Sequence, residues 1–440
     1  MAKPVRVQDI EKGMYVVDLD RPWTETPFLF QGFEVRTDEQ IRELQRLCRY
    51  VYVSETADPG LAPRPVGQRL RSGERAGATQ TGRRTREPRV SVDGDTHDAG
   101  ILAASRTVRR TSPRYENAAP LAEEIAVARV LETQAREFVY TLHDDVRLGR
   151  PIDVERLQAL VADMVASVIR NPDALIWFTQ LREQHVYTAL HSIRVAILAL
   201  VLGRHLDLAV SELHVLGVGA LLHDIGKLKV PGELLDKPEP LTDPEFELIK
   251  THVPAGVKIL EAASRIPVAA IEVAACHHER YTGGGYARGL AGDRIGLFGL
   301  IGAIVDSYDA MTSDRAYRQG RSPYEALGTL YAMRDKGYHA GLVDQFIQCL
   351  GTYPIGSVVE LTNGAIGVVI AVNPRRYLRP TVALALNADN TPCPERTILD
   401  LGATPRSGPG AVDVRRVLAP GAHGVQGADY MPGRIVRALP

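Results

Sequence analysis

The chain has 440 residues, more than one average domain needs, which predicts two or three domains. Its hydrophobic content of 45% and charged content of 24% are typical of a globular protein. The formal net charge of −1 excludes a whole-chain electrostatic preference for nucleic acid or a membrane surface.

Cysteine usage and hydropathy predict the cellular compartment of the protein. The four cysteines, Cys48, Cys276, Cys349 and Cys393, form no CxxC pair, so neither a disulfide framework nor a zinc ribbon is expected. The first residues lack the apolar core of a secretory signal. The longest apolar run, around 195–202, is well short of the roughly 20 residues that a membrane helix needs. We therefore expect a cytoplasmic protein without a membrane span.

Residues 1–56 predict a small α+β module. Met14 to Val17 and Tyr50 to Val53 have the composition of short strands. Asp38 to Cys48 places apolar residues on one helical face.

Residues 57–118 differ sharply in composition. Pro, Gly, Ser, Thr and Arg dominate, so the segment cannot bury enough apolar surface to offset the entropy of ordering it. We expect a disordered linker. Its arginines could contact nucleic acid or an acidic partner, but a solvated linker is the favoured interpretation.

Residues 119–350 predict an all-helical domain, because apolar residues recur there at intervals of three and four without β alternation. The expected helices are 122–142, 152–169, 185–206, 210–222, 244–263, 267–277 and 297–311.

Strand patterns return in residues 351–402. Segments 357–361 and 365–372 flank Asn363-Gly364, a strong hairpin signal, and 381–386 supplies a third strand. We expect a small β subdomain here and a loose Gly- and Pro-rich tail over 403–440.

The most informative residues for function are histidines and aspartates gathered within 191–306. Neutral imidazoles and carboxylates suit Fe, Mn and Zn, and a carboxylate with two oxygens can bridge two ions. The set is too large for one ion and predicts two. Its members are His191, His223, Asp224, His252, His277, His278 and Asp306.

A single histidine in an apolar helix is more often a hydrogen-bonded core residue, and His185, His205, His214 and His339 are given that interpretation. Asp306 is harder to dismiss, because a buried unpaired carboxylate is costly. Asp309 lies three residues further on and shares its helix face.

Motif order adds a family resemblance. HDIGK at 223–227, HHERY at 277–281, GY at 285–286 and DSYDAMTSDR at 306–315 resemble the HD-GYP domain, a bacterial subgroup of the HD metal-dependent phosphohydrolases. The resemblance covers about 180–350. GMYV at 13–16 and TPFLF at 26–30 resemble a small domain of unknown function that often precedes HD-GYP domains.

The resemblance implies a multidomain protein built mainly of an all-α HD-type helical bundle, with the α+β module before it and the β subdomain after it. It also implies hydrolysis of the bacterial messenger cyclic di-GMP with two or three iron or manganese ions.

Residue roles are carried over by position. His191, His223, Asp224 and Asp306 would surround one metal, and Asp224 would bridge to a second metal held by His252, His277 and His278. Lys227 would approach the scissile phosphate. Tyr286 and Asp309 would face the nucleotide, and Arg315 and Arg318 would bind phosphate through their forked guanidinium groups.

Two departures from the family pattern bear on these roles. The family loop Asp-Gly-x-Gly-Tyr-Pro reads TGGGYA at 282–287, so Ala287 lacks the φ restriction of proline and the aspartate is replaced by Thr282. Members with three metals carry a glutamate four residues before the first histidine, where this chain has Tyr187. We therefore predict two metals.

The resulting hypothesis is a dinuclear cyclic di-GMP phosphodiesterase whose first product is pGpG; a second cut to GMP is left open. The leading alternative is a catalytically weak module that binds cyclic di-GMP or a partner protein and in which the altered loop has ended turnover. Two further alternatives are an HD enzyme with another nucleotide substrate and an interaction scaffold that acts through the N-terminal module and the Arg-rich linker. Protein partners at the module or the loop, and a homodimer, are compatible with each.

Overall fold

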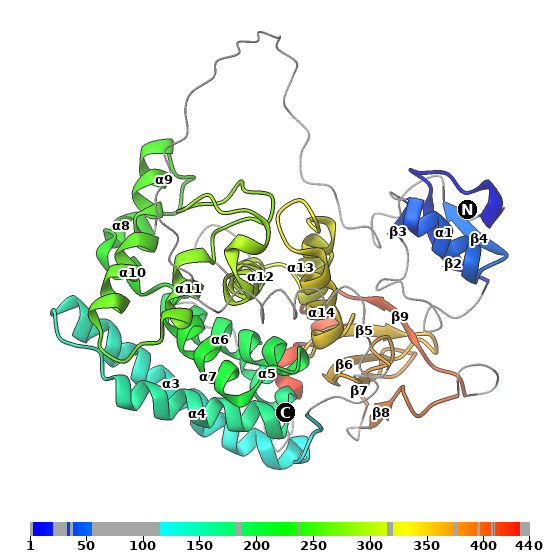
Figure 1. The fold of residues 1–440 in the computed structure, drawn as a ribbon. Helices are drawn as coiled ribbons and strands as arrows, with labels where there is room; N and C mark the ends of the chain where they lie inside the picture. Colours follow the sequence, from blue (N-terminus) through cyan, green and yellow to red (C-terminus); the bar gives the residue numbers. More distant parts are fainter. Residues whose placement is uncertain are drawn as a thin grey trace, which may run out of the picture.

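A mainly helical domain lies between two small antiparallel sheets along the chain (Figure 1). The computed structural model describes residues 3–20, 33–35, 38–54, 115–180, 187–235, 237–314, 320–373, 376–393, 397–405, 408 and 410–431. The multidomain, mainly α architecture expected from the sequence is confirmed.

The N-terminal module combines a four-stranded sheet with one helix. Its elements are β1 (Lys3–Arg6), β2 (Tyr15–Leu19), β3 (Phe33–Glu34), α1 (Asp38–Leu47) and β4 (Tyr50–Ser54). The strand order is β1-β4-β2-β3, and all neighbours are antiparallel. Leu44 of α1 and Val51 of β4 are fully buried, so the amphipathic face of the helix covers the sheet.

Most of the segment expected to be a disordered linker, residues 55–114, lies outside the described residues. The end of that segment is anchored to the helical domain. The Tyr115 hydroxyl donates to the Leu208 carbonyl at 2.7 Å, and the Ala118 amide donates to the Arg170 carbonyl at 2.9 Å.

The helices of the helical domain are α3 (Leu121–Arg147), α4 (Val154–Arg170), α5 (Pro172–Thr179), α6 (Tyr187–His205), α7 (Val210–Leu222), α8 (Gly232–Leu235), α9 (Asp243–Lys250), α10 (His252–Ala262), α11 (Val268–Cys276), α12 (Leu297–Thr312), α13 (Pro323–Ala332) and α14 (Ala340–Leu350). The seven expected helices have counterparts in the structure, one of them divided in two, whereas α5, α8, α13 and α14 were not expected.

One expected helix, 244–263, is two helices in the structure. The chain turns at Thr251, whose hydroxyl donates to the Leu248 carbonyl at 2.6 Å. Pro254 follows three residues later, and proline, which lacks an N–H, fits only the first turn of a helix. The break makes His252 the first residue of α10.

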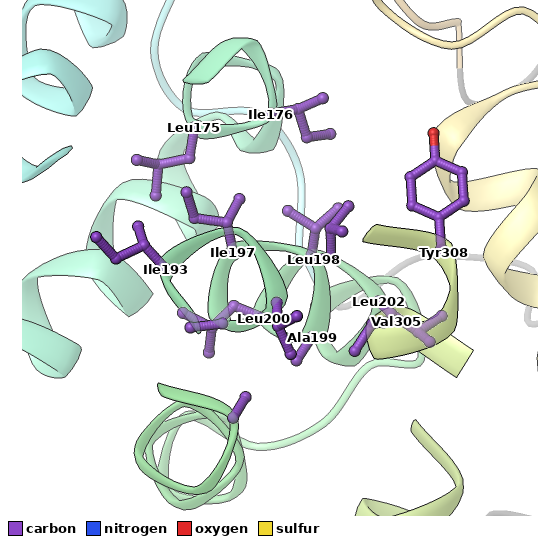
Figure 2. Close-up of a cluster of buried hydrophobic side chains, with 14 of the residues drawn as sticks. Leu175, Ile176, Ile193, Ile197, Leu198, Ala199, Leu200, Leu202, Val305 and Tyr308 are labelled. Carbon is purple, nitrogen blue, oxygen red and sulfur yellow. The ribbon is translucent and has the colours of Figure 1, made fainter. Parts of the chain in front are cut away.

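Helix α6 lies at the centre of the domain and is apolar on all sides, as expected of a buried helix. Figure 2 shows side chains leaving it toward α5, with Leu175 and Ile176, and toward α12, with Val305 and Tyr308. Because α6 is packed all round, it holds the residues on its first turns in fixed positions.

Helix α5, which the sequence did not predict, joins the helical domain to the C-terminal sheet. Asn171 caps it by accepting a hydrogen bond from the Asp173 amide at 3.1 Å. Trp177 is fully buried, and its indole nitrogen donates to the Ile370 carbonyl at 3.1 Å.

The C-terminal sheet has five strands in the order β8-β7-β6-β5-β9, all antiparallel. They are β5 (Val358–Leu361), β6 (Ile366–Ala371), β7 (Thr381–Leu386), β8 (Ile398–Asp400) and β9 (Val414–Val417). The hairpin at Asn363-Gly364 and the three expected strands are present.

The region after 402 differs from the expected loose tail. Val417 of β9 pairs with Val359 of β5, and Met431 is only 2% exposed in the main hydrophobic core. Sheet pairing and apolar burial order this segment despite its glycines and prolines; residues 432–440 lie outside the described part.

Within the described part of the chain, none of the helices combines the length and the apolar character that crossing a lipid bilayer requires.

Candidate metal centre

Seven side chains from five places in the helical domain converge on one buried point. His191 projects from α6, and Asp306 projects from α12. The others stand at helix ends, with His223 and Asp224 after α7, His252 at the start of α10, and His277 and His278 after α11. All seven predicted metal ligands are therefore brought together, and all but His278 are buried.

Asp224 divides the cluster into two halves. Its Oδ2 lies 3.4 Å from His191 Nε2 and 3.3 Å from His223 Nε2. Its Oδ1 lies 3.4 Å from His252 Nε2 and 3.6 Å from His277 Nε2. Each carboxylate oxygen thus faces its own pair of imidazoles, which is the arrangement that a bridging carboxylate requires.

Asp306 closes the open side of both halves. Its Oδ1 lies 3.1 Å from His191 Nε2, and its Oδ2 lies 3.9 Å from His278 Nδ1. The carboxylate therefore extends the first half and reaches toward the second.

Hydrogen bonds on the outer nitrogens fix the orientation of four rings. Their Nδ1 atoms lie 2.7–2.9 Å from acceptors, which are Asp309 Oδ2 for His191, the Ala220 carbonyl for His223, the Ile249 carbonyl for His252 and the Ala274 carbonyl for His277. An Nδ1–H that donates to such an acceptor leaves Nε2 with a lone pair. All four Nε2 lone pairs then point into the cluster.

The centre fits divalent cations. His223 Nε2 and Asp224 Oδ1 are buried and have no hydrogen-bond partner among the described residues. Leaving such atoms unsatisfied is costly, and a cation between them would satisfy both. Each half of the cluster contains imidazoles, and carboxylates lie between the halves. This set of ligand atoms suits a transition-metal ion in each half.

The protonation states agree with this assignment. Burial lowers the pKa of His223 and brings the pKa of His252 down to about 4, so both rings are neutral near pH 7. Burial alone would raise the pKa of Asp224, but Lys227 and His223 hold it well below its usual range. Neutral imidazoles and an ionised carboxylate are the forms that bind metal.

Lys227 and Tyr286 border the centre. Lys227 Nζ forms an ion pair with Asp224 Oδ2. The Tyr286 ring stacks on His278 with centroids 4.6 Å apart. Burial, and then the charges of Asp306 and Asp224, raise the pKa of the Tyr286 phenol, which is therefore neutral and able to donate a hydrogen bond.

Asp309 is not placed where the sequence interpretation put it. It was expected to face the nucleotide, but it is 2% exposed and lies behind His191. Arg194 Nε donates to its Oδ1 at 2.6 Å. Burial would raise the pKa of Asp309, yet Arg194 and His191 hold it at about 2. The carboxylate orients His191 and has no free edge for a substrate.

Glu279 fixes the loop that carries Tyr286. Its carboxylate accepts hydrogen bonds from the Arg288 amide at 2.7 Å and the Leu290 amide at 3.1 Å. A Cβ on Gly285 would lie 2.4 Å from Glu279 Cα, so only glycine permits this approach. Thr282, in place of the family aspartate, donates to the Lys336 carbonyl at 2.5 Å. The loop is therefore restrained despite the missing proline.

Three residues named from the sequence are not described at the level of their side chains. Arg315 and Arg318 lie within 315–319, outside the described residues, and the side chain of Tyr187 is also outside. Their predicted roles stay predictions.

Arg194 and Glu279 were missed by the sequence interpretation, although signals for both exist. Arg194 follows His191 by three residues, so it shares a face with it in a helix that is otherwise apolar. Glu279 directly follows the histidine pair in sequence, which is the signal that could have found it; the structure adds that the carboxylate is only 1% exposed.

Comparison with family models divides the chain into three matches. An HD domain matches residues 173–341, a domain of unknown function (DUF3391) matches 2–157, and a KOW domain associated with HD domains matches 358–406. The HD match contains all seven clustered residues.

Known relatives agree with these matches. A cyclic di-GMP phosphodiesterase of Pseudomonas aeruginosa is 33% identical over 91% of this chain and 89% of its own length. A cyclic di-GMP phosphodiesterase of Thermotoga maritima is 39% identical over 32% of this chain and 39% of its own. A 3′3′-cGAMP-specific phosphodiesterase of Vibrio cholerae is 34% identical over 37% and 31%, respectively. The chain belongs to the HD-GYP family of HD-domain phosphodiesterases.

Proposed function

We propose that the protein hydrolyses cyclic di-GMP at the centre around Asp224. The observation that carries the proposal is that each oxygen of Asp224 faces a separate imidazole pair. The names of the Pseudomonas and Thermotoga relatives support the choice of substrate.

Two bound ions would be held by the two halves of the cluster, with Asp224 between them. When bound, they would act as Lewis acids on the phosphodiester and lower the pKa of water. Mixed imidazole and carboxylate donors favour Fe or Mn, and Tyr187 in place of a glutamate supports two ions rather than three.

The chain's own groups position the diester and balance its charge. The Lys227 side chain is 19% exposed beside Asp224, and its ammonium would offset negative charge that develops on the phosphate. Arg315 and Arg318 follow α12 in sequence and would add forked contacts to phosphate. Hydrolysis adds water across one P–O3′ bond and gives pGpG; a second hydrolysis would give GMP.

A second cyclic dinucleotide is the alternative substrate that an observation favours, because a relative in Vibrio cholerae is named for 3′3′-cGAMP. A binding module without turnover is less well supported. Among the described residues, His223 Nε2 and Asp224 Oδ1 are buried without a hydrogen-bond partner. This arrangement is costly unless a metal ion binds both atoms, which argues against a centre that has lost its metals.

Replacing Asp224 tests the proposal. We expect purified Asp224→Ala to lose bound metal and the release of pGpG from cyclic di-GMP, measured on one anaerobic preparation by metal analysis and nucleotide chromatography. Asp163→Ala, an exposed aspartate on α4, is the matched control and should retain both. An Asp224→Ala protein with both metals and full activity would contradict the assignment.

We further propose that the N-terminal module carries regulatory input to the helical domain, and that protein partners or a second copy bind at the module or the Tyr286 loop. The four cysteines are scattered in the sequence without a CxxC pair, and this spacing supports the reducing cytoplasm as the proposed place of action.

A further inference from the structure

An exposed aromatic ring stands beside the metal centre. Phe246 on α9 is 43% exposed, and its ring meets the Tyr286 ring edge-on with centroids 6.1 Å apart. Tyr286 in turn stacks on His278, so a chain of ring contacts runs from the cluster to α9. Figure 1 shows α9 at the edge of the helical domain.

A cation lies over the same surface. Lys250 Nζ is 4.8 Å from the centroid of Phe246 and 5.5 Å from that of Tyr286. It also lies 2.6 Å from Glu247 Oε1, but that carboxylate side chain is 68% exposed, so solvent weakens the pairing. The ammonium can therefore turn toward a bound ligand at little cost.

Helix α9 holds these two residues in register with the centre. Glu245 accepts hydrogen bonds from the Thr242 amide and from Lys237 at its N-terminal end. At its C-terminal end the Ile249 carbonyl accepts from His252 Nδ1 at 2.7 Å. The same helix thus presents Phe246 and orients a cluster histidine.

The packing of α9 does not explain Phe246. None of the residues of α9, all of which are described, is fully buried, so the ring does not contribute to a core. What distinguishes Phe246 from other exposed apolar side chains is its contact with Tyr286 and Lys250, which places an exposed aromatic face and a cation next to the cluster.

We propose that Phe246, Lys250 and Tyr286 form a base-binding subsite for one guanine of the dinucleotide. This inference rests on the proposed function. A purine stacks on an aromatic face regardless of sequence, which supplies affinity. The Lys250 ammonium donates to O6 and N7, which are both acceptors in guanine, whereas adenine places an amino donor beside N7. Stacking therefore holds the base, and Lys250 selects guanine.

Three variants on one helix test the subsite: Phe246→Ala, Lys250→Met and, as control, Leu248→Ala, whose side chain is 44% exposed. We expect Phe246→Ala to raise the KM for cyclic di-GMP roughly tenfold, within the range that loss of one stacked base gives. Its kcat and bound metal should stay unchanged. Lys250→Met should raise the KM for cyclic di-GMP while leaving the inhibition constant of cyclic di-AMP as in wild type. Leu248→Ala should behave as wild type.

Calorimetry on metal-stripped protein provides a second readout, because it measures the affinity for cyclic di-GMP without turnover. The affinity should fall in Phe246→Ala and Lys250→Met and stay unchanged in Leu248→Ala. A wild-type KM in Phe246→Ala overturns the subsite; this is the result expected if the ring docks another protein. An equal rise of the KM in Leu248→Ala overturns it as well. A metal-loaded wild-type protein that does not cleave cyclic di-GMP contradicts the proposed function instead, so the two failures are distinct.

Discussion

Asp309 and His191 form a hydrogen bond between Oδ2 and Nδ1 at 2.8 Å, and both side chains are almost fully buried. The bond joins α12 to α6 and sets the face that His191 presents to the cluster. Arg194 completes the arrangement from one turn further along α6, with its guanidinium on both oxygens of Asp309.

Replacement of Asp309 should weaken metal binding without removing a metal ligand. For Asp309→Asn we expect roughly 10–100-fold lower affinity, the usual cost of losing a carboxylate that orients a ligand histidine. Competition with a chelator of known affinity measures the change. The exposed aspartate of α4 supplies the control, Asp163→Asn. Unchanged affinity in Asp309→Asn would show that His191 is held in place without the carboxylate.

Gly226 should not tolerate a methyl group. A Cβ there would lie 1.9 Å from the His252 carbonyl and 2.4 Å from the Gly256 amide, so α10 would have to move away. We expect Gly226→Ala to lower the free energy of unfolding by roughly 1–3 kcal/mol, as overpacking does, and to reduce bound metal by displacing His252.

The control for Gly226 is Gly232→Ala, because a Cβ at Gly232 meets nothing within 4 Å. Urea unfolding measures the free energy of unfolding of both variants, and metal analysis measures their bound metal. Equal behaviour of the two would mean that α10 shifts freely and that its close approach is unimportant.

Loss of the Glu279 carboxylate should loosen the Tyr286 loop. Glu279→Ala leaves the Arg288 and Leu290 amides without their acceptor. Because unmade buried hydrogen bonds cost about 1–3 kcal/mol each, we expect the loop to open and the KM to rise roughly tenfold with metal content retained.

Trypsin cleavage after Arg288 reports the same opening independently of activity. Glu279→Gln, which keeps one acceptor oxygen, should restore part of the protection. If trypsin cuts the alanine variant no faster than wild type, the carboxylate does not hold the loop.

Glu124 should contribute stability that depends on pH. It is 2% exposed on α3, and Arg170 Nε on α4 donates to it at 2.7 Å. Burial alone would raise its pKa, but hydrogen bonds from Arg170 and Ser167 lower the pKa below its usual range. A carboxyl whose pKa is lowered by folding stabilises the native state above its unfolded pKa, and this contribution is lost as the pH falls through the folded pKa.

Glu124→Gln should therefore lower the free energy of unfolding at pH 7 by roughly 1–3 kcal/mol, and the difference from wild type should narrow at pH 4. Urea unfolding at the two pH values measures it. The exposed neighbour Glu123→Gln is the control. A difference that stays constant or widens at the lower pH would exclude the ionised pair as its source.

Local sequence patterns predicted the elements that local physics controls. The 3.6-residue repeat of 210–222 gave the helix α7 with the same bounds, and Asn363-Gly364 placed the hairpin between β5 and β6. The prediction failed where long-range contacts decide the structure. β9 pairs with the edge of β5, and α5 is tied to the sheet by the Trp177 indole, which donates to the Ile370 carbonyl.

The sequence alone predicted which seven histidines and aspartates gather at one site, because so many potential metal ligands in this order are improbable as ordinary core residues. The sequence could not predict the role of Asp309. Helical spacing shows that Asp306 and Asp309 share a face, but not which of them faces the cluster and which lies behind His191. Only the packing of α12 against α6 placed Asp309 behind His191. In the same way, tertiary structure alone gave each oxygen of Asp224 its own pair of histidines, because α6 and the ends of α7, α10 and α11 must meet to do so.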